Sequence, residues 1–174
     1  MTGVQTCALP ICLAAAALDY ALDLPLDYGF AAVQPEAARE PYAVLLTMTS
    51  RADKLWAEER WAEAARELAM RVLLPWGTEA ERSRATRIAS GLPAAEVAPR
   101  MSLEQLTGVL GRAQFVLGVD TGLTHLAAAL GTRTVGIYCG SDPALTGIHG
   151  APRGRNVGAL GAPPSVAQAL QALQ

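Results

Sequence analysis

The chain has few of the residues on which several protein classes depend. Of its 174 residues, three are cysteine and two are histidine, and no CxxC pair occurs. This excludes a disulfide framework and a zinc-ligand cluster, and it favours a reducing compartment. No uninterrupted apolar run reaches the ~18–20 residues that a membrane-spanning helix requires. The net charge of −2 argues against a nucleic-acid-binding surface.

Lysine is the scarcest charged residue. Of the 14 basic residues, all but Lys54 are arginine. By contrast, 51% of the residues are hydrophobic, which is enough apolar surface to form a core and offset the entropy of the chain. The length corresponds to one domain, or to one domain with a short extension.

The first residues differ in character from the rest. Residues Gly3–Ile11 read GVQTCALPI, which resembles the translation of a sequencing-library adapter fused in frame to a gene. A secretory signal is the alternative, but no basic segment precedes the apolar stretch. We therefore expect residues 1–11 to be foreign to the natural protein, and its natural start to be missing.

The remaining sequence predicts one α/β domain. A short helix is expected over Leu13–Leu24, followed by a proline-containing linker that ends at Pro41. Beyond it, short apolar runs alternate with helical periodicity, which predicts a Rossmann-like parallel sheet with helices on both faces. The expected strands are Tyr42–Thr47, Arg71–Pro75, Ala95–Ala98, Gln114–Val119 and Thr134–Tyr138. The expected helices are Glu58–Met70, Thr78–Ser90, Leu103–Arg112, Thr121–Leu130 and Ser165–Leu173.

In parallel sheets ligands bind at the carboxyl ends of the strands, where the segment DTGLTH is the strongest candidate. A buried strand ends at Asp120, and a helix begins at Thr121 and Gly122, whose free N–H groups and dipole suit a phosphate. Asp120 suits sugar hydroxyls beside that phosphate, because like charges repel, and His125 follows one turn later. The alternative is that Asp120 only caps the helix and His125 is a core residue.

Three other loops give weaker signals. Thr49, Ser50 and Lys54 follow the first strand, and two hydroxyls with an ammonium suit a diphosphate, although a solvated turn is the alternative. Glu81 follows the second strand and could accept hydrogen bonds from ribose hydroxyls, or it could belong to an exposed helix face. Residues Gly140–Gly147 (GSDPALTG) predict a turn that could also line a ligand.

Five motifs together resemble the ADP-heptose lipopolysaccharide heptosyltransferases. They are TSRADKLW, LPWG, MSLEQL, GVDTGLTHLAAALG and SDPALTG, in family order, and the resemblance extends over about Leu13 to Gln174. DTGLTH with LPWG is similar to the type I enzymes, which add the first heptose to Kdo, whereas type II enzymes typically have DSGLMH. The resemblance implies a GT-B glycosyltransferase. Residues 12–41 would then be the interdomain linker, and residues 42–174 the C-terminal, donor-binding domain.

The resemblance also implies roles for individual residues. Thr49, Ser50 and Lys54 would lie at the donor diphosphate and sugar, and Asp120 at the heptose hydroxyls. Lys54 and Asp120 would act in catalysis by stabilising the donor and the departing ADP. Glu81 would contact the ribose, and Met101 would lie beside the adenine. The full implied donor site is Thr49, Ser50, Lys54, Glu81, Met101, Asp120, Thr121, Gly122 and His125.

For the whole enzyme, the resemblance implies an ADP-heptose donor, a Kdo-lipid A acceptor, and no metal, cofactor or nucleic acid. It also implies a place on the cytoplasmic face of the inner membrane. In this family the general base is an aspartate of the N-terminal domain, which has no counterpart here, so this chain alone is expected to bind donor weakly and to transfer little or nothing. A non-catalytic nucleotide-binding module, or a GT-B enzyme with another nucleotide-sugar donor, is the alternative.

The sequence departs from the family pattern at four places. Between the helix that contains Trp61 and the strand that begins at Arg71, the chain is a few residues short, so that turn is expected to be either strained or misaligned. Arg133 stands where proline is usual, and Cys139 stands where glycine or an aliphatic residue is usual. Ile148 and His149 replace the usual pair of proline and an aromatic residue before Gly150.

Overall fold

The computed structural model describes residues 15–21, 28–29 and 40–174. Residues 15–18 are helical, within the first predicted helix. The segment expected to be foreign, and most of the predicted linker, lie outside the described residues. In the part that is described, no helix is long and apolar enough to cross a membrane.

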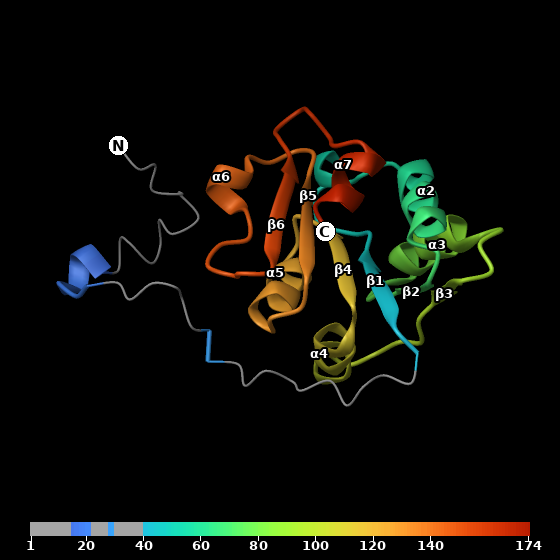
Figure 1. Cartoon of the computed structure of the whole chain (residues 1–174), viewed down its shortest axis with the longest axis horizontal. Coiled ribbons are helices and arrows are strands. Elements are labelled where there is room, and N and C mark those ends of the chain that lie inside the picture. Colours follow the sequence, from blue (N-terminus) through green and yellow to red (C-terminus); the bar gives the residue numbers. More distant parts are fainter. Residues whose placement is uncertain (1–14, 22–27, 30–39) are drawn as a thin grey trace.

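The core of the fold is a six-stranded sheet in the order β3-β2-β1-β4-β5-β6, with every neighbouring pair parallel (Figure 1). All five predicted strands are present, which confirms the predicted fold class. A sixth strand at the edge, β6, was not predicted. The strands are β1 (Tyr42–Leu46), β2 (Arg71–Leu74), β3 (Ala95–Val97), β4 (Phe115–Val119), β5 (Thr134–Tyr138) and β6 (Gly154–Gly158).

Helices cover both faces of this sheet. Helices α2, α3 and α7 pack on one face, and α4 and α5 pack on the other (Figure 1). The five helices expected after the linker are confirmed, and the four-residue helix α6 is additional. Their bounds are α2 (Glu58–Leu68), α3 (Glu79–Ala89), α4 (Leu103–Arg112), α5 (Gly122–Ala129), α6 (Pro143–Thr146) and α7 (Val166–Gln171), with a 3-10 turn, η2, at Ala52–Lys54.

Strand β1 shows why the central strands are continuous apolar runs. Ala43 and Leu45 belong to the core beneath α2, α3 and α7, whereas Val44 and Leu46 belong to the core beneath α4 and α5. A strand covered on both faces needs apolar residues at every position rather than at alternate ones. This is why a run such as YAVLL marks a strand inside a parallel sheet.

The strand order reverses between β1 and β4. The chain runs outward from β1 through β2 to β3, then returns to β4 on the other side of β1, where Leu45 pairs with Leu117. Connections leaving neighbouring strands in opposite directions open a crevice at the carboxyl edge of the sheet. The loops that follow β1 and β4 border this crevice, and they contain most of the predicted site residues.

The turn between α2 and β2 contains a strained residue, as its length predicted. Helix α2 ends at Leu68, and Ala69 then adopts a φ of 50° in the left-handed region. Its N–H donates to the Arg66 carbonyl at 3.2 Å. A residue with a Cβ pays about 1–2 kcal/mol for this conformation, which glycine adopts freely.

Arg133, one of the four departures from the family pattern, has a clear structural role. Its Nη1 donates to the Leu173 carbonyl at 2.9 Å, and its guanidinium lies 5.7 Å from the centre of the Phe115 ring. The side chain therefore ties the end of the chain to strand β4. Cys139 is simply buried in the core beneath α7.

Candidate functional site

Asp120 is the centre of a polar cluster at the crevice. It follows the last residue of β4, and only 6% of it is exposed. Lys54 Nζ donates to Asp120 Oδ2 at 2.7 Å, and both side chains are largely buried. His125 Nε2 lies 3.7 Å from the other oxygen, Oδ1. The structure thus brings together three residues that the sequence places on three separate elements.

Two contacts hold the loop after β1 against its neighbours. Thr49 Oγ1 donates to the backbone carbonyl of Asp120 at 2.9 Å, which joins the loops that follow β1 and β4. On the other side, a Cβ at Gly140 would lie only 2.5 Å from the Asp53 carbonyl oxygen. Glycine at this position therefore lets η2 approach the end of β5, and this approach places Lys54 beside Asp120.

The start of α5 lies where the sequence predicts an anion site. Thr121 is the N-cap, and the helix begins at Gly122, which is exposed. Thr124 Oγ1 donates to the Val119 carbonyl at 2.7 Å, and a Cβ at Gly118 would collide with that hydroxyl. The close packing of α5 on β4 fixes the direction of the helix. The N–H groups of Gly122 and Leu123, in its first turn, have no acceptor within the helix, so they present positive charge at the crevice.

Two further residues of the cluster were not among the predicted site residues. Ser141 Oγ donates to Asp120 Oδ2 at 2.6 Å, and Thr146 Oγ1 donates to the same oxygen at 3.0 Å. The sequence indicated that their segment could line a ligand, but gave neither residue a role. Their signal was their place after β5, the strand that pairs with β4.

The contacts of Asp120 keep its carboxyl ionised. Burial by itself raises its pKa, but the nearby His125 and the hydrogen bonds from Lys54, Ser141 and Thr146 outweigh burial and hold the pKa well below its ordinary value. A carboxyl with such a low pKa stays charged at neutral pH. It can therefore accept hydrogen bonds from hydroxyl groups, but it is a poor proton acceptor.

Next to this cluster is a cleft of about 390 Å³. It is continuous with the cluster through Thr49 and Thr121, which line the cleft and contact or follow Asp120. Five predicted site residues line it: Thr49, Ser50, Glu81, Met101 and Thr121. The rest of the lining, mostly apolar, is Leu46, Thr47, Met48, Pro75, Trp76, Gly77, Leu103, Leu106 and Leu123. Such a lining suits a flat heterocycle with a polar extension.

The Glu81 carboxylate already has partners in this structure. Its Oε2 accepts hydrogen bonds from the N–H groups of Gly77 at 2.6 Å and Thr78 at 3.2 Å, completing a capping box at the start of α3. The nearby Trp76 forms part of the cleft wall and is held by its indole N–H, which donates to the Ala98 carbonyl at 2.6 Å. The sequence predicted neither contact. Both hydrogen bonds to Glu81 use Oε2, so among the described residues its other carboxylate oxygen, Oε1, remains for a ligand.

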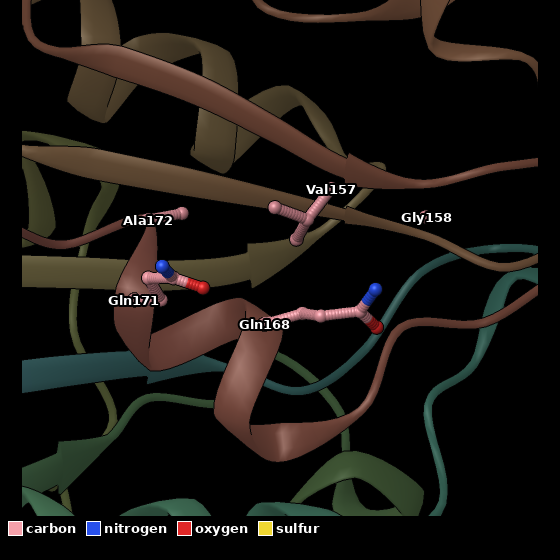
Figure 2. A pocket seen from close by; sticks show the side chains of 5 residues that line it. All are labelled: Val157, Gly158, Gln168, Gln171 and Ala172. Carbon is pink, nitrogen blue, oxygen red and sulfur yellow. The ribbon is translucent and has the colours of Figure 1, made fainter.

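A second hollow, of about 320 Å³, lies between β6 and α7 and contains none of the predicted site residues. Figure 2 shows the amide side chains of Gln168 and Gln171 extending from α7 near Val157 of β6. None of its lining residues is charged, so it is a weaker candidate for an anionic ligand. Within the described ranges, no group of three or more His, Cys, Asp and Glu residues could hold a metal ion.

The sequence profile of glycosyltransferase family 9 (heptosyltransferase) matches residues 11–171. The chain belongs to this family. The lipopolysaccharide heptosyltransferase 1 of Salmonella typhimurium is 45% identical over 118 residues, which are 66% of this chain and 37% of that protein. The corresponding protein of Pseudomonas aeruginosa is 44% identical over 144 residues, 79% of this chain and 41% of that protein.

Solved structures of this heptosyltransferase family share the fold. The E. coli heptosyltransferase WaaC with ADP superposes with a TM-score of 0.78 at 38% identity, over 90% of this chain and 52% of that one. The resemblance that the five motifs indicated is therefore confirmed. The chain spans about half the length of that structure and about two fifths of the curated relatives.

Proposed function

We propose that this chain is the donor-binding part of a lipopolysaccharide heptosyltransferase I. The whole enzyme would transfer L-glycero-D-manno-heptose from ADP-heptose to the Kdo of Kdo-lipid A, with inversion at the anomeric carbon. The observation that carries the proposal is the Lys54–Asp120 pair beside a largely apolar cleft, in a chain 45% identical to a heptosyltransferase 1. A solved relative at 37% identity is described with ADP-2-deoxy-2-fluoro heptose.

Each part of the donor has a matching part of the site. The adenine would enter the apolar portion of the cleft near Met101, and the ribose would lie at Glu81. The diphosphate would lie between Lys54 and the N-terminus of α5, with the hydroxyls of Thr49 and Ser50 beside it. The sugar would then reach Asp120 and His125. Lys54 has three N–H donors, so one bond to Asp120 leaves two for phosphate oxygens.

In the reaction, negative charge develops on the ADP as the bond to the sugar breaks. Lys54 and the first N–H groups of α5 would stabilise that charge, because both are fixed in place before the donor arrives. Asp120 would orient the sugar by accepting from its hydroxyls. In this proposal the positive charge at the diphosphate comes from the protein, and no metal is needed.

The proposed acceptor would place the whole enzyme at a membrane surface. Kdo-lipid A is amphiphilic, so an enzyme that glycosylates it works where the lipid is anchored. We propose a peripheral position on the cytoplasmic face of the inner membrane, and an acceptor site in the part of the relatives that this chain does not span.

Calorimetry on the 174-residue chain tests the donor. ADP-heptose is expected to bind more tightly than UDP-sugars. Lys54→Ala and Asp120→Ala are each expected to weaken the binding of ADP-heptose at least about tenfold, as for loss of a charged hydrogen bond. Arg51→Ala is a matched control, because this exposed cation of the same loop pairs with Asp53. Equal binding of all nucleotide-sugars would contradict the proposed donor. A transfer assay with Kdo-lipid A is expected to show no product from this chain alone, and transfer would overturn that expectation.

A further inference from the structure

The carboxylate of Asp120 is contacted unevenly. Lys54 Nζ at 2.7 Å, Ser141 Oγ at 2.6 Å and Thr146 Oγ1 at 3.0 Å all donate to the same oxygen, Oδ2. The other oxygen, Oδ1, faces His125 Nε2 at 3.7 Å, which is beyond hydrogen-bond distance. Among the described residues, Oδ1 therefore keeps its accepting capacity for a ligand, whereas Oδ2 is fully occupied.

We propose that Ser141 and Thr146 are positioning residues that fix the rotation of the Asp120 carboxylate, and that they thereby make the site selective for the sugar of the nucleotide-sugar. This inference rests on the proposed function, in which Asp120 contacts the sugar. The hydroxyls act through Asp120 and need not contact the donor themselves. With Oδ2 fixed, Oδ1 presents its lone pairs in one direction, toward sugar hydroxyls.

We call the Ser141 and Thr146 hydroxyls, which both bind Asp120 Oδ2, the clamp. Its physical reason is the rotational freedom of an aspartate side chain. The terminal torsion of aspartate has a broad energy profile, so one ion pair does not define the plane of the carboxylate. Lys54 adds little directional control, since its ammonium is a compact charge on a flexible stem. Ser141 and Thr146 belong to a different segment from Lys54, and both donate to Asp120 Oδ2. Their hydrogen bonds remove the rotational freedom of the carboxylate before the sugar arrives.

The segment that carries the two hydroxyls is itself held firmly. The Asp142 side chain accepts from Ala144 N–H at 2.9 Å and caps α6. A Cβ at Gly147 would lie 2.3 Å from the Pro143 carbonyl oxygen, so the chain turns tightly after the helix. Thr146 is exposed and lies outside the two core clusters. Its hydroxyl can therefore be removed without disturbing the core.

Three variants test the clamp by comparing ADP-heptose with ADP in calorimetry. Thr146→Val removes the hydroxyl and keeps the shape, Ser141→Ala removes the second hydroxyl, and Thr146→Ser keeps a hydroxyl. Thr146→Val and Ser141→Ala are each expected to weaken the binding of ADP-heptose about three- to tenfold, as for loss of one hydrogen bond. ADP binding is expected to stay within about twofold, and Thr146→Ser is expected to behave as the wild type.

Thr107→Val is the matched control, because Thr107 Oγ1 donates to the Leu103 carbonyl of its own helix, at 2.8 Å, and to no other group in the part of the chain that the structure describes. Thermal unfolding of each variant checks that it is folded. Unchanged ADP-heptose binding in both hydroxyl-deletion variants, or an equal loss for ADP and ADP-heptose, would overturn the clamp. If the wild type fails to bind ADP-heptose, the proposed function fails and the clamp with it. If the wild type binds and only the variants contradict the expectation, the proposed function stands.

Discussion

Lys54 Nζ lies 2.7 Å from Asp120 Oδ2, although the two residues are 66 positions apart in the sequence. Both side chains are largely buried, at 16% and 7% exposure. A buried ion pair contributes little net stability by itself, but removing one partner leaves the other as an unpaired charge. This relationship makes Asp120 important for stability as well as for the proposed donor contact.

Asp120→Asn is expected to lower the free energy of unfolding by about 1–3 kcal/mol, because Lys54 loses its counter-charge while the amide oxygen still accepts from the hydroxyls. Urea unfolding at pH 7 measures this. Asp53→Asn is the control, because Asp53 is exposed and its pair with Arg51 is on the surface, where such pairs add little. If both variants have the same stability, the Lys54–Asp120 pair is not a buried interaction.

The low pKa of Asp120 also makes stability depend on pH. Because the folded state holds the pKa below its ordinary value, the charged carboxylate adds stability above the unfolded pKa of about 4, and this contribution is lost as the pH falls below it. The wild type is therefore expected to lose more stability than Asp120→Asn between pH 5 and pH 3, in a series of urea titrations. Parallel curves of stability against pH for the two proteins would contradict the assignment of a lowered pKa to Asp120. Glu58, whose pKa is also lowered, titrates in both.

Leu103 provides a test of the nucleotide end of the cleft. It is 65% exposed and lines the cleft at the start of α4. A bound adenine would cover part of this side chain, so Leu103→Ala is expected to weaken ADP binding about three- to fivefold, without changing thermal stability. Leu160→Ala is the matched control, since Leu160 is 68% exposed and lies away from the cleft. Equal ADP affinity for the two variants would show that the adenine of ADP does not lie against Leu103.

Ala69→Gly is expected to stabilise the protein by about 0.5–1 kcal/mol, because glycine adopts the left-handed φ of 50° without the steric cost of a Cβ. The entropy that glycine adds to the unfolded chain offsets part of the gain. Ala62→Gly within α2 is the comparison and is expected to destabilise by about 1 kcal/mol. Chemical denaturation at pH 7 decides, and destabilisation of similar size at both positions would show that Ala69 is not strained.

The sequence predicted the central strands and the longer helices because each has a strong local signal. The run YAVLL is apolar at every position, and Ser102 with Gln105 forms the capping box that begins α4. Strand β6 was missed because GRNVG has two glycines and one apolar side chain, so its strand state depends on pairing with β5. Helix α6 has only four residues, too few for helical periodicity to appear.

For the site, the sequence identified Lys54 and Asp120 as parts of one donor site but did not predict that they contact each other. Their direct contact depends on the pairing of β1 with β4 and on the close approach of η2 to Gly140, and neither can be read from a local pattern. Glu81 illustrates a different omission. The spacing of Thr78 and Glu81 matches a capping box, yet the sequence analysis gave Glu81 only a ribose contact or a place on an exposed helix face. The donor contacts themselves and the division into linker and domain remain predictions.

The pairing of β1 with β4 also bears on how the chain emerges during synthesis. Strands β1, β2 and β3 are all complete before β4 is made, so until then β1 is the unprotected edge of a growing sheet. Its five residues are apolar and none is charged, and unprotected edges of this kind are sites of intermolecular pairing. A nascent or truncated chain that ends before residue 115 would therefore expose an aggregation-prone strand, and docking of β4 would both remove this hazard and assemble the two halves of the site.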